Sequence, residues 1–334
     1  MKFAVVGAGA IGAYMGAMLA RAGEEVALIA RGAHMRAMRE HGVRVRGISG
    51  DFVVHTQVTD DPSAVGLVDV VLLTLKAHSL TEMAPRILPL LGTGTVVVSA
   101  QNGIPWWYFY KAGGQWDGTR IESVDPGGVI EANIPSSHVV GCVIYCATII
   151  SEPGVIEHIE SNRFPIGEPD GSKSDRVRMI AEALTKAGLK CPVRTNIRHD
   201  IWVKLMGNVT FNPISALSRA TLLDITSCPE TRALATSMMA EVQAICAKLG
   251  LDLGISIEQR IEGAAKVGHH KTSMLQDVEA GRPMELESLM GAVVELGEKL
   301  SVPVTNTKAI YACAKLLNEK ITSGGWTASS TISH

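Results

Sequence analysis

The sequence predicts an α/β protein with a doubly wound parallel sheet in its N-terminal part and only helices in its C-terminal part. Three observations predict this class. Short β-branched runs alternate with helical stretches, a glycine-rich turn joins the first run to the first helical stretch, and helical spacing without strands follows. Because 334 residues are long for one compact domain, we expect domains at 1–195 and 196–334. Residues 322–334 are rich in Gly, Ser and Thr and should form a frayed tail.

The composition suits a well-buried enzyme and excludes a general nucleic-acid partner. Hydrophobic residues make up 46% of the chain and aromatic residues only 4%, so the cores must be built from aliphatic side chains and methionine. The formal net charge of −2 leaves no basic surplus to neutralise a phosphate backbone. The six cysteines form no CxxC pair and no metal-type spacing with histidine, so we expect free thiols and no metal site.

The sequence shows no targeting or membrane segment. Phe3–Val6 already belongs to the predicted fold, which leaves no room for a signal peptide before it. The apolar run Val68–Leu75 is far shorter than the roughly 20 residues of a membrane span. We therefore expect a cytoplasmic protein without membrane association, and the sequence is compatible with a homodimer.

The first 31 residues indicate a dinucleotide-binding unit. Lys2–Val6 predicts a short buried strand that runs directly into the turn Gly7–Gly12, whose sequence GAGAIG is a full GxGxxG. Ala13–Ala22 then predicts a helix, and Glu25–Ala30 predicts a second strand. Because GxGxxG indicates dinucleotide binding only between a strand and a helix, this strand–turn–helix–strand context predicts a Rossmann domain.

The glycines of this turn have separate physical tasks. Gly7 permits the tight turn, Gly9 lets the backbone approach a pyrophosphate, and Gly12 allows close packing of the helix on the strand, which Gly16 extends by one turn. The phosphates then lie at the helix N-terminus, where unpaired N–H groups favour negative charge. The alternative is a glycine-rich turn without a ligand. The residues expected to contact the cofactor are Gly7, Ala8, Gly9, Ala10, Ile11 and Gly12.

Arg31 predicts which dinucleotide is bound. It ends the second strand, where an NAD-binding protein would place an acidic residue for the ribose hydroxyls, and no Asp or Glu occurs between Ala27 and Arg39. An arginine at this place can instead pair with the 2′-phosphate of NADPH, and Arg36 is placed to assist. The alternative is a solvated surface arginine.

Two further polar positions follow predicted parallel strands. The strand Val68–Leu75 ends at Lys76, where a cation faces the crevice in which doubly wound sheets bind ligands. The strand Thr95–Ser99 is followed by Gln101-Asn102-Gly103, and the amide of Asn102 can hydrogen-bond a nicotinamide or a substrate carbonyl. A snorkelling lysine and an ordinary turn residue are the alternatives.

Six of the fifteen aromatic residues lie at positions 106–116, which we call the aromatic segment. Aromatic side chains in a loop mark either a lid or contact surface, or a small core under the loop, and the sequence leaves both open. Further elements are expected without a site assignment: strands at Val43–Arg46, Phe52–His55, Val139–Ala147, Val155–Ile159, Phe164–Gly167 and Leu189–Arg194, and helices at Ser79–Leu91 with a break at Pro85 and at Asp175–Ala187.

The stretch from Asn196 to Pro213 predicts a largely buried helix with a polar stripe. Lys204, Asn208 and Asn212 are spaced four and four, so they line one face of it. Pro213 removes one helical donor, so we expect a kink beside Asn212. Because unsatisfied buried polar groups are costly, the stripe needs partners, either a polar substrate or a structural polar network.

Two more segments carry polar candidates. Ser273 lies in TSMLQD, after two histidines that have no companion ligands at metal spacing. Glu285 lies in RPMELE near an expected helix start, where it could simply complement the helix dipole. The last helices are expected at Leu286–Leu300 and Thr307–Lys320.

Together these motifs resemble the ketopantoate reductase (2-dehydropantoate 2-reductase) family. The resemblance runs in order through GAGAIG, Arg31, LTLKAHS, QNG, IWVKLMGNVTFNP, TSMLQD and RPMELE, and so spans nearly the whole chain. It implies a Rossmann domain followed by a helical domain, with the active site in the cleft between them. It also implies the reaction, in which NADPH passes hydride to the 2-keto carbon of ketopantoate and gives pantoate on the route to coenzyme A.

The resemblance assigns roles to individual residues. It implies that Lys204 is the general acid that supplies a proton to the developing alkoxide. It implies that Asn208 and Asn212 orient the hydroxyl and carboxylate groups of the 2-oxo acid substrate and that Ser273 binds its carboxylate. Glu285 matches a residue near cofactor and substrate that also positions Lys204, and Ala147 matches a backbone contact to the cofactor.

The sequence departs from the family pattern at two places. Some family members carry a further substrate-binding asparagine ten residues after Asn212, where this chain has Leu222. The aromatic segment is longer than the short helix expected of well-studied members. Both differences concern substrate recognition rather than hydride transfer. The alternatives are therefore a paralogous reductase of another branched or aromatic 2-oxo acid, and an NADPH-binding sensor without turnover.

Overall fold

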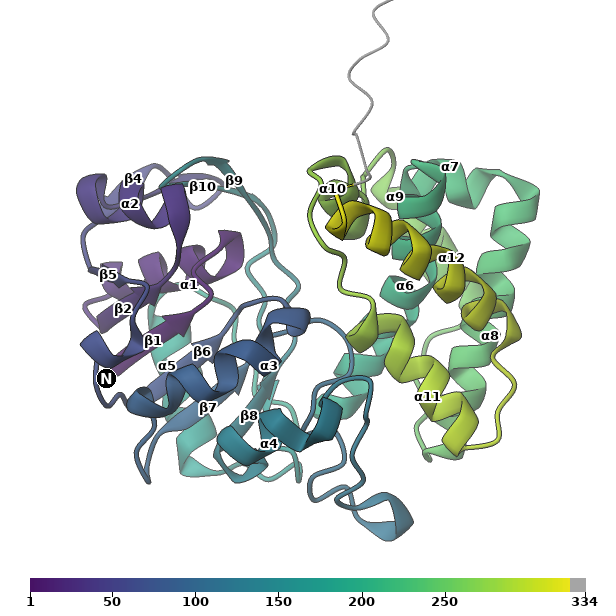
Figure 1. Ribbon diagram of the computed structural model, residues 1–334, viewed down its shortest axis with the longest axis horizontal. Helices are drawn as coiled ribbons and strands as arrows, with labels where there is room; N and C mark the ends of the chain where they lie inside the picture. Colours follow the sequence, from purple (N-terminus) through teal and green to yellow (C-terminus); the bar gives the residue numbers. More distant parts are fainter. Residues whose placement is uncertain (325–334) are drawn as a thin grey trace, which may run out of the picture. The chain divides into compact units, whose positions relative to one another are not determined.

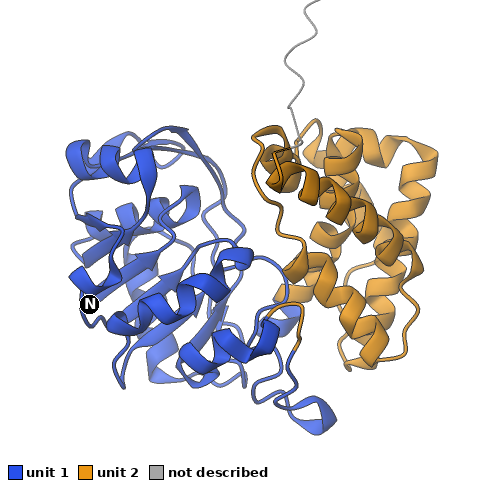
Figure 2. Ribbon diagram, in the orientation of Figure 1, with its two compact units in different colours: residues 1–120, 125–200 blue, residues 121–124, 201–334 orange. Residues whose placement is uncertain are grey.

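The computed structural model describes residues 1–324 and divides into two compact units (Figure 2). Unit 1 contains residues 1–120 and 125–200, and unit 2 contains residues 121–124 together with the chain from residue 201 onward. Of the expected tail, residue 322 still belongs to the last helix, whereas residues 325–334 lie outside the described residues.

Unit 1 is built around a seven-stranded sheet in the order β11-β8-β7-β6-β1-β2-β5 (Figure 1). All neighbouring strands are parallel except β11, which pairs antiparallel with β8. The central strands are short apolar runs that are buried along their length, as expected of a sheet covered on both faces. The strands are β1 (Lys2–Val6), β2 (Glu25–Ile29), β5 (Gln57–Thr59), β6 (Val70–Leu73), β7 (Val96–Ser99), β8 (Val139–Cys142) and β11 (Ile166–Gly167). The predicted doubly wound α/β class is confirmed.

Helices cover both faces of this sheet. Phe3, Val5 and Leu72 share one core with side chains of two helices, α1 and α5, while alternate strand residues point to the opposite face. In Figure 1, α3 and α4 cross the near face of the sheet. The helices of unit 1 are α1 (Ala10–Arg21), α2 (Gly32–His41), α3 (Leu80–Met83), α4 (Val129–Asn133) and α5 (Asp175–Lys186).

Three elements predicted within unit 1 differ from the structure. The helix expected at Ser79–Leu91 is α-helical only in α3 and continues as a 3₁₀-helix over Ala84–Leu90, because Pro85 and Pro89 each remove a backbone donor. The strand expected at Val139–Ala147 is two strands, β8 and β9 (Ala147–Glu152), which belong to different sheets. The strand expected at Leu189–Arg194 forms only isolated bridges, at Lys190 and Val193.

A second sheet in unit 1 has the order β4-β3-β10-β9. It joins β3 (Val43–Gly47) and β4 (Phe52–Val54) to β9 and β10 (Val155–Glu160). A chain of hydrogen bonds attaches it to α1, since the Tyr14 hydroxyl lies 2.9 Å from Ser49 Oγ, which lies 2.7 Å from His158 Nδ1. This sheet therefore extends the dinucleotide-binding half rather than forming a domain of its own.

The aromatic segment forms a small core within unit 1. Trp106, Trp107, Tyr108 and Phe109 are at most 6% exposed. The Trp106 indole N–H donates to the carbonyl of Ile134 at 3.1 Å. Of the two interpretations that the sequence left open, these contacts fit a packed core under the loop rather than a loosely held lid.

Arg198 fixes the backbone of this segment. Its guanidinium donates to the carbonyls of Tyr108 and Tyr110, both at 2.6 Å, and to that of Pro169. Burial lowers the pKa of this arginine, which has three carbonyl oxygens as partners. One cation thus holds two separate loops together at the start of the helix that follows.

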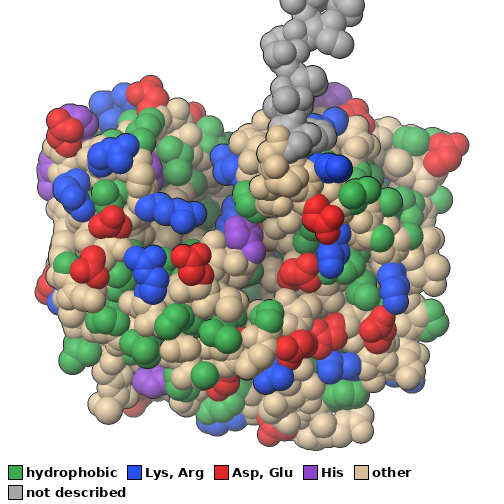
Figure 3. All heavy atoms as spheres, in the orientation of Figure 1, with side chains coloured by type: hydrophobic (Ala, Val, Ile, Leu, Met, Phe, Trp, Pro, Cys, Tyr) green, Lys and Arg blue, Asp and Glu red, His purple; other side chains and the backbone are tan. Residues whose placement is uncertain are grey.

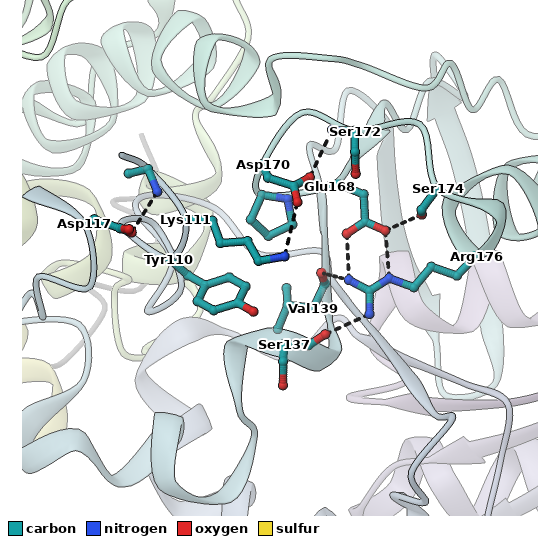
Figure 4. A network of polar contacts seen from close by, with 12 residues as sticks. Tyr110, Lys111, Asp117, Ser137, Val139, Glu168, Asp170, Ser172, Ser174 and Arg176 are labelled. Carbon is teal, nitrogen blue, oxygen red and sulfur yellow. Dashed lines mark hydrogen bonds and ion pairs between the residues drawn. The ribbon is translucent and has the colours of Figure 1, made fainter. Parts of the chain in front are cut away.

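A polar network lies beside the aromatic segment (Figure 4). Lys111 pairs with Asp170 at 3.2 Å, and hydrogen bonds from Ser172, together with Lys111, hold the pKa of Asp170 at about 2. The neighbouring Glu168 is 4% exposed and receives Arg176 Nη2 at 2.6 Å and Nε at 2.7 Å. Arg176 also donates to two backbone carbonyls, those of Ser137 and Val139. These contacts anchor the loops around the aromatic segment.

Unit 2 is helical, as predicted, and its core includes the fully buried Trp202 of α6. Capping boxes begin two of its helices, α7 and α9. The expected helix Leu286–Leu300 begins instead as a π-helical turn, Glu287–Gly291, and becomes α-helical at α11. The helices are α6 (Ile197–Ser218), α7 (Leu222–Ser227), α8 (Pro229–Lys248), α9 (Ile257–Val267), α10 (Ser273–Glu279), α11 (Ala292–Lys299) and α12 (Thr305–Thr322).

Residues 121–124 belong to unit 2, although they are far from the rest of it in sequence. The Glu295 carboxylate on α11 accepts the N–H groups of Glu122 at 2.9 Å and Ser123 at 2.8 Å. Burial alone would raise the pKa of Glu295, but these hydrogen bonds and Lys299 outweigh it, so the pKa is lowered. The carboxylate therefore stays ionised and holds this short excursion of the chain.

The surface is mixed in charge. On the face shown in Figure 3, basic and acidic side chains are interspersed, in keeping with the net charge of −2. None of the helices among residues 1–324 combines the length and the hydropathy needed to cross a bilayer. All six cysteines are free thiols, as predicted.

A pair of Gly→Ala substitutions tests the packing of α1 on the sheet. A Cβ at Gly12 would lie 2.3 Å from Thr74 Oγ1 and 2.6 Å from the Gly7 carbonyl oxygen. We expect Gly12→Ala to lower the free energy of unfolding by about 1–3 kcal/mol because the helix must move away from the strand. Gly263, inside α9, has open space around a built Cβ. Gly263→Ala should raise the free energy of unfolding by about 0.5–1 kcal/mol. Urea denaturation of both variants measures the two signs, and a neutral Gly12→Ala would contradict the close packing.

Candidate active site

The turn between β1 and α1 has the geometry of a phosphate site. Gly7 has φ +93°, and a Cβ there would lie 2.5 Å from the backbone nitrogen of Leu75, so only glycine fits. A Cβ at Gly9 would meet nothing nearer than 3.9 Å, which leaves the surface of the turn open to a ligand. The first turn of α1 has neither a side-chain cap nor an acidic residue. Its first N–H groups are thus available to an anion.

Neighbouring strands hold this turn in place. The N–H groups of Gly7 and Ala8 both donate to the carbonyl of Ile29 at the end of β2, at 3.1 and 2.9 Å. On the other side, Thr74 Oγ1 after β6 donates to the Gly7 carbonyl at 3.0 Å. The turn is therefore preorganised by the sheet itself, and it fits a dinucleotide pyrophosphate.

Arg31 lies where the cofactor assignment requires a cation. It follows β2 as the N-cap residue of α2, and its side chain is exposed. The first turn of α2 carries no acidic residue, and Arg36 on the same helix is also exposed. Both cations are thus accessible to a phosphate, and no carboxylate of this helix start competes with it.

His34 is a residue of this region that the sequence did not single out. Its Nδ1 accepts the N–H of Gly154 at 3.0 Å and so links α2 to the turn between β9 and β10. Burial lowers the pKa of His34, and its buried Nε2 has no hydrogen-bond partner among residues 1–324. A neutral imidazole therefore links these two elements without adding charge. A lone histidine in a helix gives no sequence signal for such a role.

Lys76 and Asn102 follow two adjacent parallel strands, β6 and β7, and both are half-buried. The side-chain amide of Gln101 donates to the carbonyl of Leu75 at 3.4 Å, which ties the two strand ends together. Because Leu75 also contacts Gly7, the structure brings the glycine turn and both polar residues to one edge of the sheet. Ala147 is the first residue of β9 in the second sheet, and this strand packs against α1.

The polar stripe of α6 is present in unit 2. Lys204 and Asn208 are half-buried, and Asn212 is 7% exposed. Apolar side chains occupy other positions of the helix, including Leu205, which is 1% exposed. The helix continues through Pro213 to Ser218 as a single element. The three polar side chains therefore share one helix.

A second cation packs against this helix. A Cβ at Gly207 would lie 2.2 Å from Nη2 of Arg260, which comes from α9. The guanidinium thus occupies the space that a side chain at position 207 would fill. The only sequence signal for this contact is a glycine inside a predicted helix.

Ser273 begins α10, and Glu285 lies in the irregular stretch that follows this helix. Ser273 is the exposed first residue of α10, while the neighbouring Thr272 caps the helix by accepting the Leu275 N–H at 3.2 Å. Ser273 is therefore not needed as a cap. Glu285 is half-buried on an irregular stretch, and the first turn of the next helix is taken by Glu287 instead.

The predicted site residues thus form two groups, each within one unit. Unit 1 carries the glycine turn, Arg31, Lys76, Asn102 and Ala147, and unit 2 carries Lys204, Asn208, Asn212, Ser273 and Glu285. In residues 1–324 no group of three or more His, Cys, Asp or Glu side chains is arranged to hold a metal ion.

Comparison with known proteins relates both groups to one family. The family model described as ketopantoate reductase PanE/ApbA matches residues 3–106, and the model of its C-terminal part matches residues 196–318. A 2-dehydropantoate 2-reductase from Mesorhizobium japonicum is 48% identical over 318 residues, which covers 95% of this chain and 98% of that protein. The chain belongs to the ketopantoate reductase family. The predicted resemblance is thereby confirmed.

Solved structures of the ketopantoate reductase family share the fold. A candidate ketopantoate reductase from Ralstonia solanacearum superposes with a TM-score of 0.91 at 38% identity and covers 96% of this chain and 98% of that one. A 2-dehydropantoate 2-reductase from Geobacter metallireducens gives a TM-score of 0.82 at 26% identity, with 95% and 99% covered. As a member of this ketopantoate reductase family, the protein is an oxidoreductase.

Proposed function

We propose that the protein is an NADPH-dependent 2-dehydropantoate 2-reductase, which reduces ketopantoate to pantoate in pantothenate and coenzyme A biosynthesis. The observation that carries this proposal is the 48% identity to a 2-dehydropantoate 2-reductase over nearly the full length of both chains. Such a reduction needs a cofactor site, which the glycine turn of unit 1 supplies. It also needs substrate binding and a proton donor, which the lysine–asparagine face of α6 supplies.

Residues of unit 1 would supply most of the contacts to the cofactor. The open surface at Gly9 and the free start of α1 fit the pyrophosphate, and Arg31 fits the 2′-phosphate. When bound, NADPH supplies the hydride that reduces the keto carbon. Further contacts to it are proposed for the backbone of residues 7–12 and for Lys76, Asn102, Ala147 and Glu285.

Residues of unit 2 would bind the substrate and supply the proton. We assign Lys204 as the general acid, because the oxygen of the reduced carbonyl develops negative charge and an ammonium N–H can protonate it. Asn208 and Asn212 offer amide groups on the same helix face for the substrate's hydroxyl and carboxylate. Asn102 and Ser273 are assigned to substrate binding, and Glu285 is assigned to positioning Lys204.

A substrate panel tests this proposal. The rate of NADPH oxidation is measured with ketopantoate and with branched and aromatic 2-oxo acids at equal concentration. We expect ketopantoate to give the highest kcat/KM. If an aromatic or other branched 2-oxo acid is clearly preferred, the protein is a paralogous reductase, the alternative that Leu222 suggests. Tight NADPH binding without turnover of any acid would instead favour a sensor.

Three broader assignments accompany this function. We propose that residues 1–195 serve the cofactor and residues 196–334 the substrate. A cytoplasmic location is supported by the six free thiols, which a reducing compartment maintains. A homodimer is proposed as the simplest symmetric assembly, and sedimentation of the purified protein measures it.

A further inference from the structure

Glu285 lies on a stretch of chain without regular structure. Residues 282–286 form neither helix nor strand, between α10 and the π-helical turn. Within this stretch, the Leu286 N–H donates to the Met284 carbonyl at 3.1 Å, so Glu285 is the central residue of a tight turn. Met284 and Leu286 are 2% and 3% exposed, whereas Glu285 is only half-buried. We call residues 282–287 the Glu285 strap. Without a helical or sheet ladder, its geometry depends on individual contacts.

The last helix, α12, provides two of these contacts. The Met284 N–H donates to the side-chain oxygen of Asn318 at 2.9 Å. The Tyr311 hydroxyl donates to the Glu287 carboxylate at 2.6 Å. The first contact therefore lies one residue before Glu285, and the second contact lies two residues after it. Helix α12 thus fixes the strap on both sides of the proposed site residue.

The two contacts come from one face of α12. Tyr311 and Asn318 are seven residues apart, which places them on one face of α12 and about 10.5 Å apart along its axis. The three residue steps from Met284 to Glu287 reach at most about 10 Å. The strap runs antiparallel to α12 and is held at two points by side chains of one face of that helix.

Glycine at position 291 leaves room for the second contact. A Cβ there would lie 2.4 Å from the Glu287 carboxylate and 3.1 Å from the Tyr311 hydroxyl. Burial and, as the smaller cause, the hydrogen bond to Glu287 raise the pKa of Tyr311. Its hydroxyl therefore remains a donor throughout the working pH range. At the other end of the strap, Arg282 donates its N–H to the Asp277 carbonyl at 2.8 Å and its Nε to the Asp277 carboxylate at 3.1 Å.

We infer that α12 sets the position of Glu285 for the reaction, with Tyr311 and Asn318 as positioning residues that act through the strap. This inference rests on the proposed function of Glu285. Neither side chain needs to touch the substrate. Each removes freedom from a segment that would otherwise sample many conformations, and a displacement of the order of 1 Å can cost about 10²-fold in rate.

The test compares Tyr311→Phe and Asn318→Ala with a control on the same helix. Asn306→Ala is the control, because the Asn306 amide donates to Glu241 of α8 and not to the strap. We expect each strap variant to lower kcat/KM for ketopantoate by about tenfold, chiefly through kcat, while the control stays near wild type. Hydrogen exchange at the Met284 amide shows independently of activity whether Asn318→Ala releases the strap.

A double-mutant cycle identifies the residue through which the effect passes. In a Glu285→Gln background, Tyr311→Phe and Asn318→Ala should cause no further loss, because the side chain that they position has been changed. Losses that multiply with Glu285→Gln would overturn the inference, as would wild-type kinetics in an Asn318→Ala variant whose Met284 amide exchanges freely. A wild-type protein that turns over no 2-oxo acid would refute the proposed function itself. An inert Glu285→Gln would refute only the role of Glu285 and of its strap.

Discussion

Replacement of Lys204 by alanine is expected to lower kcat for ketopantoate by about 10²–10⁴-fold. The substitution removes the ammonium group that would protonate the oxygen of the reduced carbonyl, and no other lysine lies on α6. The substitution leaves every residue assigned to the cofactor unchanged, so the dissociation constant of NADPH should change little. Steady-state kinetics and a fluorescence titration of NADPH measure the two quantities separately.

The matched control for this prediction is Lys266→Ala. Lys266 is exposed in the last turn of α9 in the same unit, so the charge change is identical while the polar face of α6 is intact. We expect wild-type kcat for the control. If Lys204→Ala turned over at the wild-type rate, the general acid would have to be another group.

Replacement of Arg31 by alanine is expected to raise the KM for NADPH by about 10–100-fold, because a hydrogen bond between charged groups contributes about 1.5–3 kcal/mol. NADH lacks the 2′-phosphate, so its KM should change by less than about twofold. The effect should shrink as salt is added, since the side chain is exposed and its charge is screened. Initial rates with each cofactor at two ionic strengths measure all three outcomes.

Arg178→Ala serves as the control for Arg31→Ala. Arg178 is an exposed arginine of α5 in the same unit, and its ion pair is with Asp175 on its own helix. It should leave both KM values unchanged. Equal losses with NADPH and NADH in Arg31→Ala would remove the 2′-phosphate assignment and leave only a general electrostatic role.

The strands and helices of the dinucleotide-binding part could be predicted from the sequence because local signals agree there. Apolar runs, a glycine turn with a fixed task for each glycine, and a following helix all indicate the same unit, and the close contacts of Gly12 with Thr74 confirm it. The second sheet could not be predicted, since β3 pairs in parallel with β10 more than 100 residues away. Nothing in either strand indicates its partner.

The site residues divide in the same way into those that local patterns predict and those that depend on contacts between elements. A helix spacing of four places Lys204, Asn208 and Asn212 on one face, because periodicity is local. The supporting residues could not be found in this way. His34, Arg260 and Tyr311 act through contacts between separate elements, and their sequence signals are a histidine, an arginine and a tyrosine in ordinary amphipathic helices. Such roles become visible only when the elements are packed.

The excursion of residues 121–124 into unit 2 has a consequence for protein engineering. A chimera that exchanges the cofactor half with that of a relative cannot be made with a single junction near residue 195. The four residues would come from the donor chain, and the Glu295 carboxylate of the recipient would then have to accept foreign backbone donors. Three junctions, at 120/121, 124/125 and 200/201, would keep each graft intact. The linear order of the sequence therefore does not by itself give the boundaries of the two units.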